Sequence, residues 1–302
     1  MSRRGWMLFA LMSVVWGIPY LLIKVAVEEV PPSVLVFART AIGAALLLPL
    51  AVRGGQLAVV RRHWRPVLVF ALLEILAPWW LLSDAELRLS SSTTGLLIAA
   101  APVLGVAVAR LSGIERLSAA RWIGLALGLF GVGVLIGPEL GGGDTWAFIE
   151  VLLAALGYAL APLIADRYLP ELPTIPLTAA CLGFAALAYA PAAAWNWPST
   201  MPSGTALAAI AGLGVVCTGL AFVAYVELIR EVGPSRSLVF IYVNPAVAVV
   251  AGVLILEEPL TALIVASFVL ILIGCALATR AEPGAAPPAG PATREAEVEV
   301  GS

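Results

Sequence analysis

The sequence is poor in charge, and this scarcity excludes several classes of protein. Only 12% of its 302 residues are charged, about half the usual share in soluble domains, while 61% are hydrophobic and the mean hydropathy is +1.01. Too few charged side chains are present to cover a water-soluble enzyme or to hold the chain disordered. The net charge of −2 also lacks the basic footprint that nucleic-acid binding needs. The composition therefore predicts an integral membrane protein with no nucleic acid among its partners.

Groups suited to metal, redox or ATP chemistry are also scarce. The one histidine, His63, falls in a basic loop rather than a ligand cluster, and no glycine-rich phosphate loop precedes a lysine. The cysteines lie inside apolar runs without metal-ligand spacing, so we expect small buried side chains. They are Cys181, Cys217 and Cys275. We predict no catalytic residue, no metal site and no cofactor.

What the sequence does contain is a series of long apolar runs. A transmembrane helix needs about 20 mostly apolar residues, and breaks at charge clusters and Pro/Gly pairs divide the chain into ten such runs. The first is too long for a secretory signal and lacks a clean cleavage site, so it is interpreted as a span. After Arg280 the chain turns polar and proline-rich, which predicts a disordered tail over 281–302. The expected spans cover 6–26, 33–52, 66–83, 90–110, 121–137, 145–165, 174–194, 205–229, 236–256 and 261–279.

Basic residues set the expected orientation. With the N-terminus inside, almost every arginine falls on the inner connections, and the outer side keeps mainly Arg88 and, at a helix end, Lys24. Such a bias predicts both termini in the cytoplasm and a multi-pass protein of the cytoplasmic (inner) membrane. The inner arginines are Arg3, Arg4, Arg53, Arg61, Arg62, Arg65, Arg110, Arg116, Arg121, Arg167, Arg230, Arg236 and Arg280.

The chain also repeats itself. A shift of 143 residues places Pro102 on Pro245, Glu115-Arg116-Leu117 on Glu258-Pro259-Leu260, and Gly131 on Gly274. Five spans per repeat is an odd number, so the two halves would insert with opposite orientation, as in secondary transporters. We therefore expect an all-α membrane protein of about ten helices, built as two inverted five-helix repeats around a central cavity. The expected units are 1–137, 138–280 and the tail 281–302.

Two stretches carry a family resemblance. The first is Trp16-Gly17-Ile18-Pro19-Tyr20, followed by Lys24, Pro31-Pro32, Phe37 and Arg39. The second is Asn244-Pro245, then Glu257-Glu258-Pro259-Leu260 and a last helix that contains glycine. Over about residues 6–279 the chain resembles the EamA-type transporters of the drug/metabolite transporter (DMT) superfamily.

That resemblance implies two EamA-like units of five helices each, a central cavity, and export of amino acids or other small metabolites. The family is broad, so the identity of the cargo does not carry over. The two repeats differ at the position before the mid-span proline, where the first half has Ala101 and the second half has Asn244. The polar member of this pair therefore occurs once.

Polar groups inside the hydrocarbon are costly and usually face a cavity or a partner. Glu74, midway along the third span, is the sharpest candidate, for proton coupling or for binding a substrate amine. Its alternative is a structural ion pair with Arg39, which itself suits a substrate carboxylate through its planar fork. Lys24 is a further candidate, with snorkelling to the outer interface as the alternative. Glu227 precedes Arg230 by three residues, a normal spacing for a structural ion pair.

Aromatic side chains form the second group of candidates. Trp16 and Tyr20 are four residues apart and share one helix face, which suits a cavity wall that holds an ammonium group by cation–π contact. Core packing or an interfacial belt explains any one of them equally well. The substrate-binding candidates are Trp16, Tyr20, Lys24, Arg39, Glu74, Trp79, Tyr158, Tyr225, Tyr242 and Asn244.

Paired helix breaks complete the prediction. Pro102 and Pro245 lie mid-span in corresponding helices, and interruptions of this kind in both halves indicate the substrate site. Gly124 and Gly128 allow close helix approach, either inside the chain or at a homodimer face. We predict a secondary transporter that moves a small metabolite by alternating access, coupled to protons through Glu74. The alternatives are an exporter of drugs or lipophilic cations, a channel, an intramembrane enzyme and a structural subunit.

Overall fold

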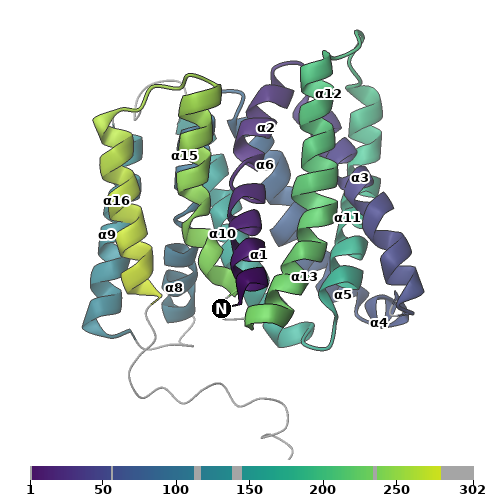
Figure 1. Ribbon diagram of the computed structural model, residues 1–302, viewed down its shortest axis with the longest axis horizontal. Helices are drawn as coiled ribbons and strands as arrows, with labels where there is room; N and C mark the ends of the chain where they lie inside the picture. Colours follow the sequence, from purple (N-terminus) through teal and green to yellow (C-terminus); the bar gives the residue numbers. More distant parts are fainter. Residues whose placement is uncertain (1, 56, 112–116, 138–144, 234–236, 280–302) are drawn as a thin grey trace, which may run out of the picture.

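The computed structural model describes residues 2–55, 57–111, 117–137, 145–233 and 237–279. Within these ranges the chain is helical and contains no strand. The helices stand side by side in one bundle, and α1 begins at its lower end in Figure 1. We call this end the N-terminal end and the other the opposite end. The predicted tail, the Glu115-Arg116 turn and the inner arginines Arg236 and Arg280 lie outside the described residues.

Helices occupy all ten stretches that the apolar runs predict, but several of these stretches are broken. The first is α1 (Arg3–Val15) and α2 (Pro19–Val27), and the third changes from α-helix to π-helix and back. The first-half elements are α1, α2, α3 (Pro32–Arg53), α4 (Leu57–Arg62), α5 (Trp64–Ala71), the π-helix η1 (Leu72–Leu76), α6 (Ala77–Ala85), α7 (Ser91–Ile98), α8 (Ala101–Leu111) and α9 (Ala119–Ile136).

The second half has the same character. Its eighth stretch contains a second π-helix, and its ninth begins with a 3-10 turn. The elements are α10 (Thr145–Tyr168), α11 (Thr174–Trp195), α12 (Gly204–Ala211), the π-helix η3 (Gly212–Leu220), α13 (Ala221–Val232), the 3-10 helix η4 (Leu238–Tyr242), α15 (Asn244–Ile255) and α16 (Ala262–Ala278).

Eight of these helical stretches are long and apolar enough to cross a membrane. Two shorter apolar helices, Phe240–Ile255 and Ala262–Ala278, occupy the positions of the expected ninth and tenth spans. Large apolar side chains such as Phe130, Leu187 and Leu254 are exposed on the outside of the bundle. A surface of this kind suits lipid and not water, and the chain is a multi-pass membrane protein.

Serine and threonine caps define where several helices begin. Ser90 accepts a hydrogen bond from the backbone N–H of Thr93 at 3.1 Å, Ser203 from that of Ala206 at 3.2 Å, and Thr261 from that of Ile264 at 3.2 Å. Each cap satisfies one of the N–H groups that a helix start leaves without a partner. The three capped starts all lie at the opposite end.

Glycines bring α9 and α16 into close contact. A Cβ on Gly274 would lie 2.4 Å from the backbone nitrogen of Gly128, and a Cβ on Gly124 would lie 2.3 Å from that of Ala278. Backbone atoms have no room to yield at these distances, so only glycine permits this packing. The Gly124/Gly128 face therefore packs within the chain, which is one of the two roles that its spacing predicts.

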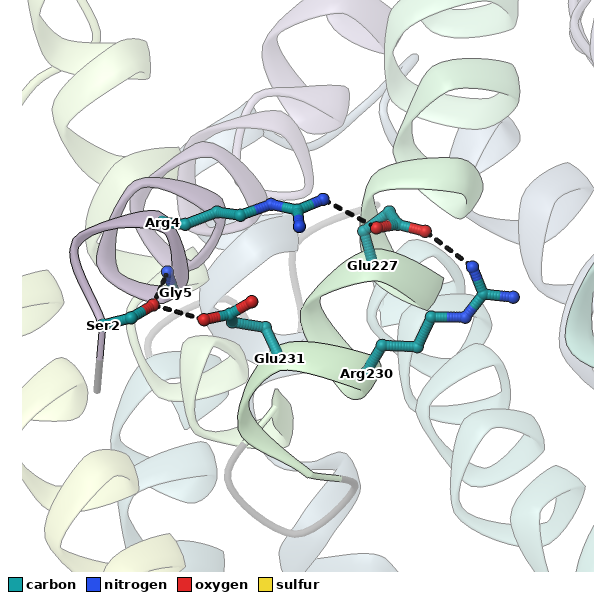
Figure 2. Close-up of polar contacts among 6 residues, drawn as sticks. All are labelled: Ser2, Arg4, Gly5, Glu227, Arg230 and Glu231. Atoms are coloured by element: carbon teal, nitrogen blue, oxygen red, sulfur yellow. Dashed lines mark hydrogen bonds and ion pairs between the residues drawn. The ribbon is translucent and has the colours of Figure 1, made fainter.

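Charged clusters fasten helices to one another at both ends of the bundle. At the N-terminal end, Glu227 on α13 pairs with Arg4 on α1 and with Arg230, each at 2.8 Å, and Ser2 donates to Glu231 (Figure 2). The predicted Glu227–Arg230 pair is thus confirmed. At the opposite end the charges are reversed, and Arg88 pairs with Asp84 at 2.8 Å and with the buried Glu150 on α10 at 2.5 Å. The two clusters therefore have opposite compositions. One glutamate lies between two arginines at the N-terminal end, and one arginine lies between two carboxylates at the opposite end.

Candidate functional site

Two helix breaks meet beside the centre of the bundle. Between α1 and α2 the chain leaves regular helix at Trp16, so the N–H of Gly17 bonds to Val14 and leaves the carbonyl of Ser13 unused by the helix. Between η4 and α15 the chain turns at Val243, just before Asn244 and Pro245. With its nitrogen facing these acceptors, the Asn244 amide donates to the carbonyls of Ser13 and Phe240, both at 3.1 Å. One side chain thus satisfies backbone groups at both breaks, as an apolar surrounding requires.

Two π-helices lie in the third and the eighth predicted spans, which the predicted repeat would place at corresponding positions. The first, η1, contains Glu74, and the second, η3, contains Cys217 and Thr218. Segments of π-helix are rare and concentrate at functional sites. Thr218 donates its hydroxyl to the carbonyl of Leu213 at 2.8 Å, five residues back, which matches the wider turn. Both π-helices contribute side chains to the central cavity.

The central cavity has a volume of about 720 Å³ and takes its walls from both halves. Its lining extends to Asp166 and Pro170, which are exposed at the N-terminal end near the end of α10. None of the described lining residues comes from a connection at the opposite end, so the cavity opens toward the N-terminal end. The predicted residues that line it are Trp16, Tyr20, Arg39, Glu74, Trp79, Pro102, Tyr158, Tyr225 and Asn244.

Arg39 on α3 is the basic group of this cavity and is only 8% exposed. Its Nε donates to Thr218 Oγ1 at 3.1 Å, and its Cζ lies 3.6 Å from the ring centroid of Trp79. The stacked ring and the threonine fix the plane of the guanidinium. The terminal nitrogens make no hydrogen bond to any described residue, so the fork is free to take a planar anion.

Glu74 on η1 is the acidic group of the same cavity. Within the described residues its carboxylate makes no hydrogen bond and no ion pair, with Arg39 or with any other side chain. The alternative interpretation, a structural pair between Glu74 and Arg39, therefore does not describe this state. The cavity instead presents one carboxyl group without a partner and one guanidinium whose terminal nitrogens are available, which suits a ligand that carries both signs of charge.

Aromatic rings form the wall near the α1–α2 break. Trp16 packs against Phe222, Tyr225 and Phe240 with ring centroids 5.4, 5.2 and 5.3 Å apart, and its Nε1 donates to the carbonyl of Cys217 at 3.2 Å. Tyr20 and Tyr158 line the cavity from α2 and α10. Such rings offer apolar contact area with few rotatable bonds, which suits a ligand with an apolar side chain.

Three predicted residues lie outside the cavity lining. Lys24 lies at the opposite end, where its Nζ donates to the carbonyls of Glu86 and Leu89. Tyr242 shares a hydrogen bond of 2.6 Å with Thr279 at the N-terminal end. Pro245 is buried in the first turn of α15 and shapes the break without facing the cavity.

Sequence reasoning missed Thr218, the residue that positions Arg39. A lone threonine in an apolar run gives no signal of its own, and the partner lies 179 residues away in the chain. The π-helices also gave no signal in the sequence. The break before Pro19 was also missed, because the first run was predicted as one span over 6–26, although Gly17 and Pro19 gave a local signal for it. Within the described residues no group of three His, Cys, Asp or Glu side chains is placed to hold a metal ion.

Broken apolar helices around a cavity that holds charged and aromatic groups define a membrane transporter. The EamA-like transporter family matches the chain over residues 3–137 and 145–280. The chain belongs to this family, within the DMT superfamily that its sequence resembles.

Named relatives agree with that membership. The inner membrane transporter YedA of Escherichia coli (strain K12) is 29% identical over 249 residues, which cover 81% of this chain and 80% of that protein. The aromatic amino acid exporter YddG of Ancylobacter novellus is 30% identical over 260 residues, which cover 83% and 88%. A crystal structure at 23% identity superposes with a TM-score of 0.66 over 91% of this chain and 96% of the other, which shows a shared fold.

Proposed function

We propose that this protein is a secondary carrier that exports a small zwitterionic metabolite, in the first instance an amino acid or a derivative. The observation that carries the proposal is that one cavity of about 720 Å³ holds the unpaired carboxyl group of Glu74 and the guanidinium of Arg39, which do not pair with each other. Glu74 would bind the ammonium group and Arg39 the carboxylate, while the aromatic wall receives the side chain. An aromatic amino acid fits this arrangement best, and YddG is named as an exporter of such compounds.

Alternating access is the mechanism that the helix breaks favour. We assign the halves 1–137 and 138–280 as inverted repeats, with the π-helices η1 and η3 and the breaks before Pro102 and Pro245 as corresponding features. The arginine bias assigns the N-terminal end to the cytoplasm, so the cavity faces the cytoplasm in this conformation of an inner-membrane protein. That state receives cargo for export.

Proton coupling through Glu74 is part of the proposal. The carboxylate lies in the cavity without a protein partner, so a proton and a cargo ammonium group would compete for it. Exchange of the two across the membrane would couple proton entry to cargo exit. Glu74→Gln should then abolish transport that is driven by a pH gradient, and normal transport by this variant at every pH would refute the coupling.

The second candidate is an exporter of lipophilic cations, since Glu74 and the aromatic wall alone would suit such a ligand. The free guanidinium of Arg39 disfavours it. The proposal includes no enzymatic reaction. The partners that it gives the protein are a small-molecule cargo and the lipid bilayer. A homodimer stays a prediction, and the Gly124/Gly128 face, which packs on α16, would not be its interface.

Binding to the purified protein tests the proposal. Cargo stabilises the folded state in proportion to occupancy, so a panel of amino acids, amines and common metabolites is screened by thermal shift with the wild type and Glu74→Gln. We expect aromatic amino acids to stabilise the wild type and to lose this effect in the variant. Stabilisation by lipophilic cations alone would favour the second candidate.

A further inference from the structure

The cavity ends below a group of charged residues at the opposite end. Ile23 and Leu82 line the cavity, and Lys24 and Glu86 follow them by one residue and by one helical turn. The Nζ of Lys24 donates to the carbonyl oxygens of Glu86 at 2.7 Å and Leu89 at 3.0 Å. These bonds join α2 to the connection between α6 and α7 directly above the cavity.

Glu258 joins a third element to this connection. It comes from the segment between α15 and α16, and its carboxylate accepts hydrogen bonds from the N–H of Ser91 at 2.7 Å, the N–H of Ser92 at 3.0 Å and the hydroxyl of Ser92. It thus satisfies the first turn of α7, where a negative charge is also favoured by the helix dipole. Gly252 leaves the space, because a Cβ there would lie 2.3 Å from Glu258 Oε2.

The carboxyl of Glu86 lies within the same group and has no partner. Glu86 is 0% exposed, and neither of its oxygens is hydrogen-bonded. The charged and titratable groups that act on it are Lys24 and Tyr20 from α2, Arg39 from α3, and Glu258. Burial raises the pKa of Glu86 well above its usual range and the charge of Glu258 adds to this, whereas Lys24 and Arg39 oppose it.

We propose that Lys24, Glu86 and Glu258 form the closure of the outer end of the transport pathway, and that Glu86 is a proton-binding site which is filled whenever this end is closed. The proposal rests on alternating access and adds a proton site distinct from Glu74. With Glu86 protonated, the charges of Lys24 and Glu258 balance. With Glu86 ionised, a second negative charge is buried without a hydrogen bond, which is costly.

Opening of the outer end would hydrate Glu86 and return the pKa of its carboxyl to the ordinary range of a glutamate. The open state therefore releases a proton that the closed state holds, and the closed state loses stability as the pH rises above the ordinary range of a glutamate. For a single proton the ratio of open to closed molecules rises by at most about tenfold per pH unit. An acidic exterior would hold the outer end closed, and a neutral or alkaline one would let it open.

Distances between two spin labels across this end test the proposal in lipid nanodiscs. The labels go at Leu87 and Leu260, which are exposed in the two connections, after alanine replaces the three buried native cysteines. In the otherwise wild-type chain we expect the longer distance to gain population between pH 5 and pH 9. In Glu86→Gln the short distance should dominate at every pH. Glu86→Met, which also lacks a titratable group, should give the same result and serves as the second variant in case the glutamine amide disturbs packing. In Gly252→Ala, whose added Cβ would lie 2.3 Å from Glu258 Oε2, the long distance should dominate throughout.

Glu29→Gln is the matched control. Glu29 lies at the same end and accepts hydrogen bonds from the backbone N–H of Ser203 at 2.6 Å and from its hydroxyl at 2.5 Å. These bonds hold the pKa of Glu29 below its usual range, so it does not titrate between pH 5 and pH 9, and the control should keep the wild-type profile.

A flat wild-type profile would overturn the proposal, and so would an unchanged pH dependence in Glu86→Gln or a closed Gly252→Ala. None of these distances needs cargo. Failure of the closure is therefore separable from failure of the proposed transport, which thermal shift measures at the cavity.

Discussion

Removal of the Arg39 guanidinium should separate cargo that carries a carboxylate from cargo that does not. Arg39 is held between Trp79, 3.6 Å from its Cζ, and Thr218, 3.1 Å from its Nε, so its fork does not need to reorganise when it binds an anion. Loss of one partner from a buried, hydrogen-bonded charge pair costs about 2–5 kcal/mol. This corresponds to a loss of affinity of roughly 30-fold to several thousand-fold.

The assay is a double cycle in which the ligand and the protein are each changed at one group. Affinities of an aromatic amino acid and of the matching amine without the carboxylate are measured by calorimetry on the wild type and on Arg39→Gln. The amino acid should lose at least about 30-fold, at the lower end of that range, while the amine should bind as well or better because a positive charge has gone. Arg39→Lys, which keeps the charge but not the fork, should lie between the two.

Equal losses for the amino acid and the amine would refute this reasoning. Arg39 would then support the cavity through Trp79 and Thr218 without contacting cargo. Because the cycle compares the two ligands on the same variant, a general loss of stability does not imitate the expected result.

Three further predictions follow from the same contacts. Thr218→Val should weaken binding of the amino acid by about 1–3 kcal/mol, because the buried Arg39 Nε loses its acceptor, and calorimetry would show no change if the contact does not matter. Gly274→Ala should lower stability by about 1–3 kcal/mol in thermal unfolding, since its Cβ would meet the backbone of Gly128, whereas Gly133→Ala, with nothing within 4 Å, should be neutral or stabilising. Glu74→Gln should abolish cargo transport that is driven by an imposed pH gradient in liposomes, whereas Glu227→Gln, a variant of the ion cluster at the N-terminal end, should keep it. Gradient-driven transport by Glu74→Gln would exclude Glu74 as the coupling group.

Most of the fold can be predicted from the sequence because each membrane span requires a long apolar run. All ten expected runs are helical in the described residues, and eight are long and apolar enough to span. The helix breaks at Pro102 and Pro245 lie where proline removes a backbone donor. The π-helices η1 and η3 were not predictable in this way, since the register of a helix depends on packing against neighbours far away in the chain.

The same limit applies to the site. Single polar residues such as Glu74 and Arg39 stand out against an apolar background, so their presence in a cavity could be predicted. Whether they pair with each other could not, because their spacing along the membrane normal suits a pair as well as two separate charges. The roles of Thr218 and Glu258 depend on contacts with α3 and α7 across more than 160 residues, and no local pattern contains that information.

Counterflow in proteoliposomes tests the central claim most directly. Vesicles loaded with an unlabelled aromatic amino acid are diluted into a trace of the labelled compound, and internal label is followed with time for the wild type and Arg39→Gln. We predict a transient accumulation of unchanged label above its external concentration, saturable in the wild type and strongly reduced in the variant. Uptake that only equilibrates without saturation, or label that emerges chemically altered, would contradict a carrier that binds its cargo between Glu74 and Arg39.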